Sequence, residues 1–307
     1  MSLRINNNIE SMNAHRNLLM NDRALSKSLE RLASGQKINR AADDPAALVI
    51  SEHMRAQVSG MEQAIRNNEV AISLVQTAEG SMNEISSILV SLRQRAISAA
   101  NVGASDQDMI DANQAEIENA LASIDRVVST TQFGHYKLLD GTNAAKTETN
   151  EDGSISTQEG LRFHVGPNAE HMASTSIRDM STSALGRVTV KEGEMPNKSN
   201  FMSLADIDVR NEQGAQDALA IIDQALTEVA TVRGELGAFQ KHTLESNLTS
   251  LQVAAENMTA AESTIRDTDM AQELATFTRN QIMTQSATAQ LAQANAMPQH
   301  VLRLLNG

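Results

Sequence analysis

The sequence predicts a mainly α fold, an elongated antiparallel helical coiled-coil rod formed by the N- and C-terminal arms, with a small β-hairpin region in the middle of the chain. Three observations predict this class. Apolar residues recur at alternating steps of three and four along most of the 307 residues. The chain has five Phe, one Tyr and no Trp, so its core rests on aliphatic side chains and Met, which suits long helices packed side by side. Only 4 Pro and 15 Gly interrupt it.

The N-terminal arm carries an apolar stripe at steps compatible with a heptad. Its members are Ile5, Ile9, Met12, Leu18, Leu25, Leu29 and Leu32. Gly35 fits the position just past the end of this helix. Asp43, Asp44 and Pro45 then form the cap of a second helix, because Asp accepts hydrogen bonds from the free N–H groups of a first turn and Pro lacks one. A paired-carboxylate catalytic or metal site at residues 43–44 is the alternative, and capping explains the pattern more simply.

The second helix is predicted to run from Pro45 to about Asn101, roughly 80 Å at 1.5 Å per residue. Asn68 falls on its apolar stripe, either as a polar residue that fixes the register or as an exposed position if the phase of the stripe is off by one. Ser105 or Asp106 caps a third helix, which ends near Thr131. Its stripe is equally regular and consists of Ile110, Gln114, Ile117, Leu121, Ile124 and Val128.

The pattern then dissolves, and the β-hairpin region is placed at about residues 133–205. Residues 161–165 alternate as in a strand and precede a turn at residues 166–168, while residues 191–200 read as a loop. Helix returns at about Gln213, with a phase shift near Gly237 that resembles a stutter. A last helix is expected from Asp267 to about Ala296, before Pro298.

Composition excludes several function classes. The net charge of −13 argues against nucleic-acid binding, and no apolar stretch is long enough for a membrane span or a secretory signal. Without Cys there is no disulfide or cysteine metal site. His164 and His171 are the remaining candidate pair for a metal, but no third ligand has suitable spacing, and no phosphate loop or catalytic motif is present. No catalytic residue, cofactor or metal site is therefore predicted. The fifteen Met are expected as core filler rather than as a promiscuous binding face.

The C-terminal arm is the most informative segment. From Met270 to Gly307 the only charged residues are Glu273, Arg279 and Arg303. Its main apolar residues are Leu274, Phe277, Ile282, Leu291, Val301, Leu302, Leu304 and Leu305. An isolated helix of this kind is marginal in water, so both arms need a partner. Either the arms simply pair within one molecule, or they pair and still leave apolar surface that neighbouring subunits cover, which repeated head to tail gives a helical filament.

Four segments resemble bacterial flagellin. They are residues 32–56 (LASGQKINRAADDPAALVISEHMRA), 66–85 (RNNEVAISLVQTAEGSMNEI), 125–141 (DRVVSTTQFGHYKLLDG) and 264–305, which begins TIRDTDMAQELATFTRNQ. The resemblance implies a structural subunit, not an enzyme, that self-assembles into the helical filament of the flagellum for motility. It implies an inner core domain built from residues 1–44 and 266–307 and a rod domain at residues 45–265.

The resemblance also implies partners and a location. The chain would bind copies of itself, a flagellar export chaperone, and the cap and junction proteins of the filament, with no nucleic acid or membrane partner. It would be exported by the flagellar type III apparatus without a cleaved signal peptide and be extracellular, or periplasmic where the flagellum is internal. Ser91 and Arg95 depart from the pattern that the flagellin-sensing Toll-like receptor recognises, so that recognition is not carried over. The alternatives are a hook–filament junction protein and a soluble helical adaptor or chaperone.

Overall fold

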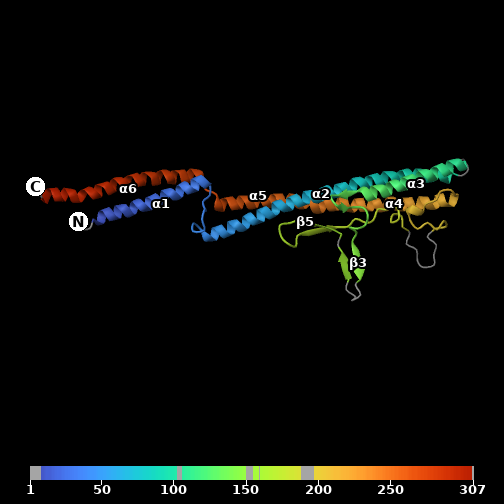
Figure 1. Ribbon diagram of the computed structural model, residues 1–307, viewed down its shortest axis with the longest axis horizontal. Helices are drawn as coiled ribbons and strands as arrows, with labels where there is room; N and C mark the ends of the chain where they lie inside the picture. The colour runs from blue at the N-terminus through green and yellow to red at the C-terminus, as the bar shows by residue number, and fades with distance from the viewer. Residues whose placement is uncertain (1–7, 102–105, 150–154, 159, 188–196, 306–307) are drawn as a thin grey trace. The chain divides into compact units, whose positions relative to one another are not determined.

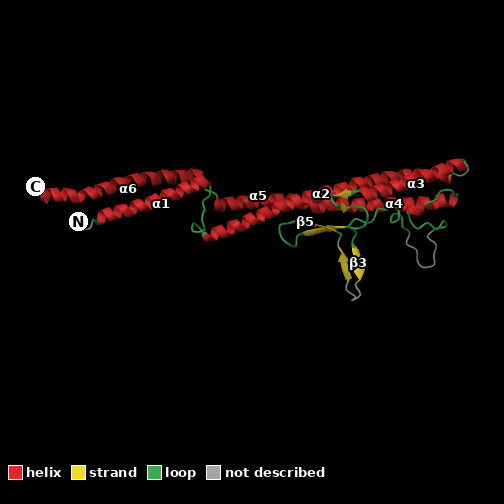
Figure 2. Ribbon diagram, in the orientation of Figure 1, coloured by secondary structure: helices red, strands yellow, loops and turns green. Residues whose placement is uncertain are grey.

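A computed structural model describes the chain except for residues 1–7, 102–105, 150–154, 159, 188–196 and 306–307. The described part is dominated by long helices, as predicted (Figures 1 and 2). The α-helices are α1 (Ile9–Ser34), α2 (Pro45–Ala100), α3 (Gln107–Thr130), α4 (Glu212–Ala238), α5 (Ser246–Arg266) and α6 (Met270–Leu305). A 3-10 helix, η1 (Leu204–Asp206), precedes α4, and a π-helix, η2 (Phe239–Glu245), joins α4 to α5.

The strands of the described residues form three separate two-stranded antiparallel sheets. Their pairs are β1 (Gln132–Phe133) with β2 (Tyr136–Lys137), β3 (Lys146–Thr149) with β4 (Ile155–Gln158), and β5 (Leu161–His164) with β6 (Met172–Thr175). The strand predicted at residues 161–165 is therefore confirmed as β5, one residue shorter, and Leu161 pairs with Thr175 in its hairpin. Of the loop expected at residues 191–200, residues 191–196 lie outside the described part.

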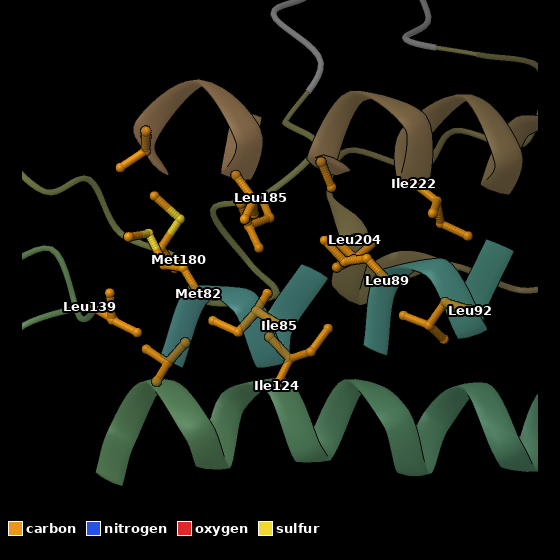
Figure 3. Close-up of a cluster of buried hydrophobic side chains, with 14 of the residues drawn as sticks. Met82, Ile85, Leu89, Leu92, Ile124, Leu139, Met180, Leu185, Leu204 and Ile222 are labelled. Carbon is orange, nitrogen blue, oxygen red and sulfur yellow. The ribbon is translucent and has the colours of Figure 1, made fainter. Parts of the chain in front are cut away.

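The chain divides into two compact units, Met1–Ser59 with Ala255–Gly307 and Gly60–Ala254. The larger unit holds the main hydrophobic core, which runs between α2, α3 and α4 and the irregular segments beside them. Figure 3 shows Met82, Ile85 and Leu89 of α2 facing this core. Leu185 and Leu204 reach it from the connecting segments, so these parts of the irregular middle of the chain contribute to the core.

The helices of the larger unit begin and end where the sequence places them. Asp106 is the N-cap of α3 and accepts a hydrogen bond from the Gln107 amide at 2.9 Å. All six predicted stripe residues of α3 are buried. Gln114 is among them because its side chain serves the backbone of the segment after η1: its Nε2 donates to Ile207 O at 3.3 Å and its Oε1 accepts from Val209 N at 2.9 Å.

Asn68 is fully buried, which decides between its two interpretations in favour of the polar residue that fixes register. Its Nδ2 donates to Ala64 O at 2.8 Å and to Val165 O at 3.3 Å, just after β5. Asn67 Nδ2 donates to His164 O at 3.1 Å, and Asn247 Nδ2 on α5 donates to Val165 O at 2.6 Å. Three asparagine amides thus hold the end of β5 against α2 and α5.

Two helix details differ from the expectation. The phase shift near Gly237 is the π-helix η2, where the wider turn moves the apolar stripe onto a new phase without ending the helix. The last helix begins at Met270 rather than Asp267, and it continues through Pro298 to Leu305. The expected end near Ala296 was therefore wrong: a proline removes one backbone donor and disfavours the helix locally, but it does not force the chain to turn.

Candidate assembly site on the terminal helices

Helices α1 and α6 run antiparallel. Polar contacts hold them together at the end where α1 begins. Asn8 is the N-cap of α1, with its Oδ1 accepting from Ser11 N at 3.0 Å. The Nδ2 of the same side chain donates to Ala294 O at 2.8 Å, and Ser11 Oγ donates to Asn295 Oδ1 at 2.6 Å. One asparagine therefore both starts α1 and joins it to α6, whose neighbouring course is plain in Figure 1.

The other end of the pair is fixed by backbone hydrogen bonds. Gly35 ends α1 with φ +71°, the left-handed conformation expected of a residue just past a helix end. Thr268 N donates to Gly35 O at 2.9 Å, and Lys37 N donates to Arg266 O at 2.7 Å. Arg31 and Glu273 add an ion pair at 3.6 Å between the two helices.

The seam between α1 and α6 contains many small or polar residues. Ser28 is buried there, and Asn280 Nδ2 donates to its Oγ at 3.4 Å. Ala287 is the other buried seam residue among those described. The larger seam side chains remain partly exposed; they are Leu18, Leu25 and Leu32 on α1 and Phe277 and Leu291 on α6. Two helices alone cannot surround these side chains, so the pair lacks a closed apolar core.

A second set of apolar side chains on α1 and α6 is more exposed than those of the seam, and we call it the outer face. Its members are Ile9, Met12, Leu19, Met20 and Leu29 on α1 and Met270, Leu274, Ile282, Met283 and Met297 on α6. Their exposed fractions range from 42% to 69%. On α6 part of this face forms a shallow groove lined by Ala271, Leu274, Ala275, Thr278, Arg279, Ile282 and Met283. An exposed groove lined mainly by apolar side chains is typical of an interaction site.

The predicted interface residues thus divide among the seam, the outer face, the C-terminal end of α6 and the undescribed N-terminal residues. Leu18, Leu25, Leu32, Phe277 and Leu291 line the seam, whereas Ile9, Met12, Leu29, Leu274 and Ile282 lie on the outer face. Val301, Leu302, Leu304 and Leu305 belong to α6, and Ile5 lies outside the described residues. Sequence reasoning missed Leu19, Met20 and Met283 on the outer face and Ser28 in the seam. A second apolar row offset from the first was the available indication for the outer face.

The two predicted cap residues, Asp43 and Asp44, make different hydrogen bonds. Asp44 Oδ1 accepts from the Ala47 amide at 3.0 Å, the geometry of an N-cap before Pro45. Asp43 differs from the expectation, because its Oδ2 accepts instead from the amides of Asn39 and Arg40, and its Oδ1 lies 2.7 Å from Lys27 Nζ on α1. The side chain of Asp43 therefore stabilises the turn at residues 39–43, between α1 and α2, instead of capping α2. Among the described residues, neither carboxylate belongs to a group of side chains that could hold a metal ion.

The Lys27–Asp43 contact predicts a pH dependence. The hydrogen bond from Lys27, followed by that from the Arg40 amide, lowers the pKa of Asp43 from 3.8 to about 2. Because the folded pKa is the lower one, this contribution to stability is present above pH 3.8 and is lost as the pH falls toward 2. In the unmodified chain we expect the free energy of unfolding to fall by about 1 kcal/mol from this group on acidification, because solvent screens the ion pair. In Asp43→Asn this decrease should be absent.

The measurement is the free energy of unfolding, from urea titrations of the two proteins at several pH values between about 5 and about 2. Asp44→Asn is the matched control, since an asparagine side chain still accepts the capping hydrogen bond. Equal pH dependence in Asp43→Asn and the unmodified chain would contradict the prediction.

No chemistry other than association stands out in the described residues. Among them no group of three or more His, Asp or Glu is placed to hold a metal ion. His164 ends β5 and His171 lies in the turn before β6, without a third ligand. Within the same residues no helix has the length and hydropathy needed to cross a bilayer.

A helical pair with paired ends, an incompletely buried seam and an apolar outer face is typical of a structural protein that completes its core by association. Two family models match this chain, the bacterial flagellin N-terminal helical region at residues 5–144 and the C-terminal helical region at residues 219–305. The chain belongs to the bacterial flagellin family. It is accordingly a structural filament subunit rather than an enzyme, as its sequence predicted.

Individual relatives agree along the whole chain. A flagellin of Bacillus subtilis is 40% identical over 99% of this chain and 100% of its own length. A flagellar filament core protein of Brachyspira hyodysenteriae is 38% identical over 98% of this chain and 99% of its own. A solved structure of a putative flagellar hook-associated protein from Vibrio parahaemolyticus shares the fold, with a TM-score of 0.56, 14% identity, and coverage of 73% of this chain and 100% of that one.

Proposed function

We propose that the chain builds a helical flagellar filament through the outer face of α1 and α6, on which neighbouring copies of the same chain dock. The observation that carries this proposal is the mismatch between the two faces of the pair. The seam buries only Ser28 and Ala287 among the described residues of α1 and α6. Large apolar side chains such as Met12, Leu274 and Ile282 stand at least half exposed outside it. A pair of helices that was complete as a monomer would bury more of its large apolar side chains.

The energetics favour several neighbours rather than one. Covering the exposed half of a Leu, Ile or Met side chain contributes about 1 kcal/mol. The ten outer-face residues therefore supply roughly 10 kcal/mol, comparable with the 4–15 kcal/mol or more that association costs in lost freedom. The net charge of −13 adds repulsion between copies. Association is thus expected to need salt and repeated contacts, which a filament provides.

The proposal also assigns the two parts of the chain to two domains. We propose that residues 1–44 and 266–307 form the inner core domain and residues 45–265 the rod domain. The ion pair between Arg266 and Glu52, at 2.7 Å, supports a firm connection near this boundary. The hydrogen bond from Arg266 is also the main cause that lowers the pKa of Glu52.

Partners and location are part of the proposal. An export chaperone is expected to cover the apolar face of the C-terminal arm before assembly, because that surface would otherwise associate prematurely. Cap and junction proteins of the filament are expected to contact the same terminal helices at the filament ends. Export by the flagellar type III apparatus would deliver the chain to the growing filament outside the cell body.

The test is seeded polymerisation of the purified full-length chain in a precipitating salt, followed by sedimentation and negative-stain electron microscopy. We expect long uniform filaments that dissolve to monomer on heating and form again when fresh seeds are added. A parallel sample without seeds serves as the control for nucleation. A discrete particle that is unchanged by seeds would contradict the proposal and favour a junction protein or an adaptor.

A further inference from the structure

Seven of the described methionines form two groups that differ sharply in exposure. Five lie on the outer face, and their exposed fractions are 69% for Met12, 53% for Met20, 51% for Met270, 50% for Met283 and 42% for Met297. In the core of the larger unit, by contrast, Met82 and Met180 are completely enclosed, with exposed fractions of 0% and 1%. Half of the ten outer-face residues are therefore thioethers open to solvent, in a protein whose core methionines are sealed.

We propose that these five outer-face methionines are an oxidation site, at which a peroxide converts the free subunit into a form that cannot join a filament. The inference rests on the proposed function, since it assigns a chemical control to the same face. It reverses the sequence-based expectation that the methionines are mainly core filler, because these five lie outside any core.

The reaction needs no catalyst from the protein and no cofactor. The thioether sulfur attacks one oxygen of hydrogen peroxide, so that an S–O bond forms and the O–O bond breaks. The departing hydroxide takes the proton of the transferred oxygen and leaves as water. Sulfur is oxidised by two electrons to the sulfoxide, and the peroxide is reduced by the same two electrons.

A sulfoxide on this face opposes docking for a simple reason. It turns a flexible apolar side chain into a polar one with a strong acceptor oxygen. Burying that oxygen at a subunit contact without a donor is unfavourable. On α6 the groove beside Met283 is lined by small and apolar side chains, with Arg279 and Thr278 its polar members. Of the five sulfoxides, only that of Met283 lies in this groove, where docking would bury it mainly against apolar side chains.

The α1–α6 pair itself is expected to survive oxidation. Its fixing contacts use Asn8, Ser11 and Asn280 side chains and the backbone near Gly35, none of which involves a methionine sulfur. The effect should therefore be on association and not on folding. Conversely, once the outer face is buried between copies, its sulfurs should be shielded, so that the filament resists the reagent that inactivates the subunit.

The experiment treats the full-length monomer with hydrogen peroxide and follows each methionine by peptide mass spectrometry. We expect the five outer-face sites to gain one oxygen each well before Met82 and Met180 react. The rate of elongation from untreated seeds should fall by about tenfold or more, with unchanged helix content by circular dichroism. Preformed filaments, treated in the same way, should be oxidised far more slowly at these five sites.

Two variants separate this site from general damage. Replacing all five by Leu, a volume-conserving change, should give a subunit that elongates and is insensitive to peroxide. The matched control replaces the exposed methionines of the larger unit, as Met109→Leu, Met172→Leu and Met202→Leu, whose exposed fractions are 50–53%. That control should stay as sensitive as the unmodified chain. If the fivefold Leu variant elongates poorly by itself, methionine sulfoxide reductases with a thiol, applied to the oxidised unmodified chain, must restore elongation.

Two results would overturn the inference. One is normal elongation of a subunit that carries sulfoxides at all five sites, and the other is equal peroxide sensitivity of the fivefold Leu variant. Failure of the proposed function looks different, because the untreated chain would then not elongate at all. In that case the two exposure groups would still oxidise at different rates, but no filament would protect the outer face.

Discussion

Replacing Ile282 by Asp will abolish filament growth while leaving the α1–α6 pair intact. The Ile282 side chain is 57% exposed and lines the groove of α6. A carboxylate at this position costs nothing in the monomer, where it is hydrated. In a subunit contact it would be buried without a partner, which costs several kcal/mol. We expect the critical concentration for assembly to rise at least about 100-fold, which corresponds to about 2.7 kcal/mol.

The measurement is the fraction of protein that sediments after seeding over a range of concentrations, with circular dichroism to verify that the helices remain. Two matched controls isolate the groove. Ile282→Leu keeps an apolar side chain and should assemble within a few-fold of the unmodified chain. Gln281→Glu adds the same charge at the neighbouring exposed position, which does not line the groove, and should be much milder. Normal growth of Ile282→Asp filaments would place the contact elsewhere.

Replacing Asn68 by Asp will destabilise the larger unit by about 3–5 kcal/mol at neutral pH, the range for an uncompensated buried charge. Asn68 is completely buried, and both hydrogen bonds from its Nδ2 are donated to backbone carbonyls, those of Ala64 and Val165. A carboxylate cannot donate them when ionised and would face two carbonyl oxygens. The other carboxylate oxygen would gain no donor either, because within the described residues the Asn68 Oδ1 has no hydrogen-bond partner.

The pH dependence gives this prediction a sign. Burial disfavours the ionised carboxyl, so the pKa of the introduced Asp is raised in the folded state above its unfolded value. The variant is then least penalised below the unfolded pKa, and the penalty grows as the pH rises through the folded pKa. Urea unfolding at acid and neutral pH measures it, with Asn67→Asp as the control, since Asn67 is only partly buried and makes one such bond. A loss below about 1 kcal/mol at both pH values would contradict the burial argument.

Much of the helical architecture was predictable because its causes are local. The stripe of α3 from Ile110 to Val128 is regular, and every member is buried. Gly35 ends α1 in the left-handed conformation, and residues 161–164 form a strand before the predicted turn. In each case the step between apolar residues, or the conformational freedom of a glycine, acts within one or two turns of chain. The function, in contrast, was predicted from the specific residues that resemble flagellin at both ends of the chain, and not from periodicity.

The candidate site was predictable only in part. The sequence identified two arms with unmet apolar surface and named Leu274 and Ile282, but it could not separate the seam from the outer face. That separation depends on which rows of α1 and α6 meet. It is held by polar contacts between distant residues, such as the hydrogen bond from Asn8 to Ala294, 286 positions along the chain. Met20 and Met283 were overlooked for the same reason, because a single apolar stripe cannot show that a helix has two.

The sequence by itself determined the helices apart from the bounds of α6, the strand at residues 161–164, the absence of catalytic motifs and the two terminal arms. The tertiary structure decided the π-helix at Phe239–Glu245, the partner of Asn68, the turn closed by Asp43 and the outward face of the terminal pair. The physical reason is one of range. Periodicity and capping act between residues a few positions apart, whereas burial and hydrogen-bond satisfaction depend on which distant segment arrives opposite, and that is settled only when the chain has folded.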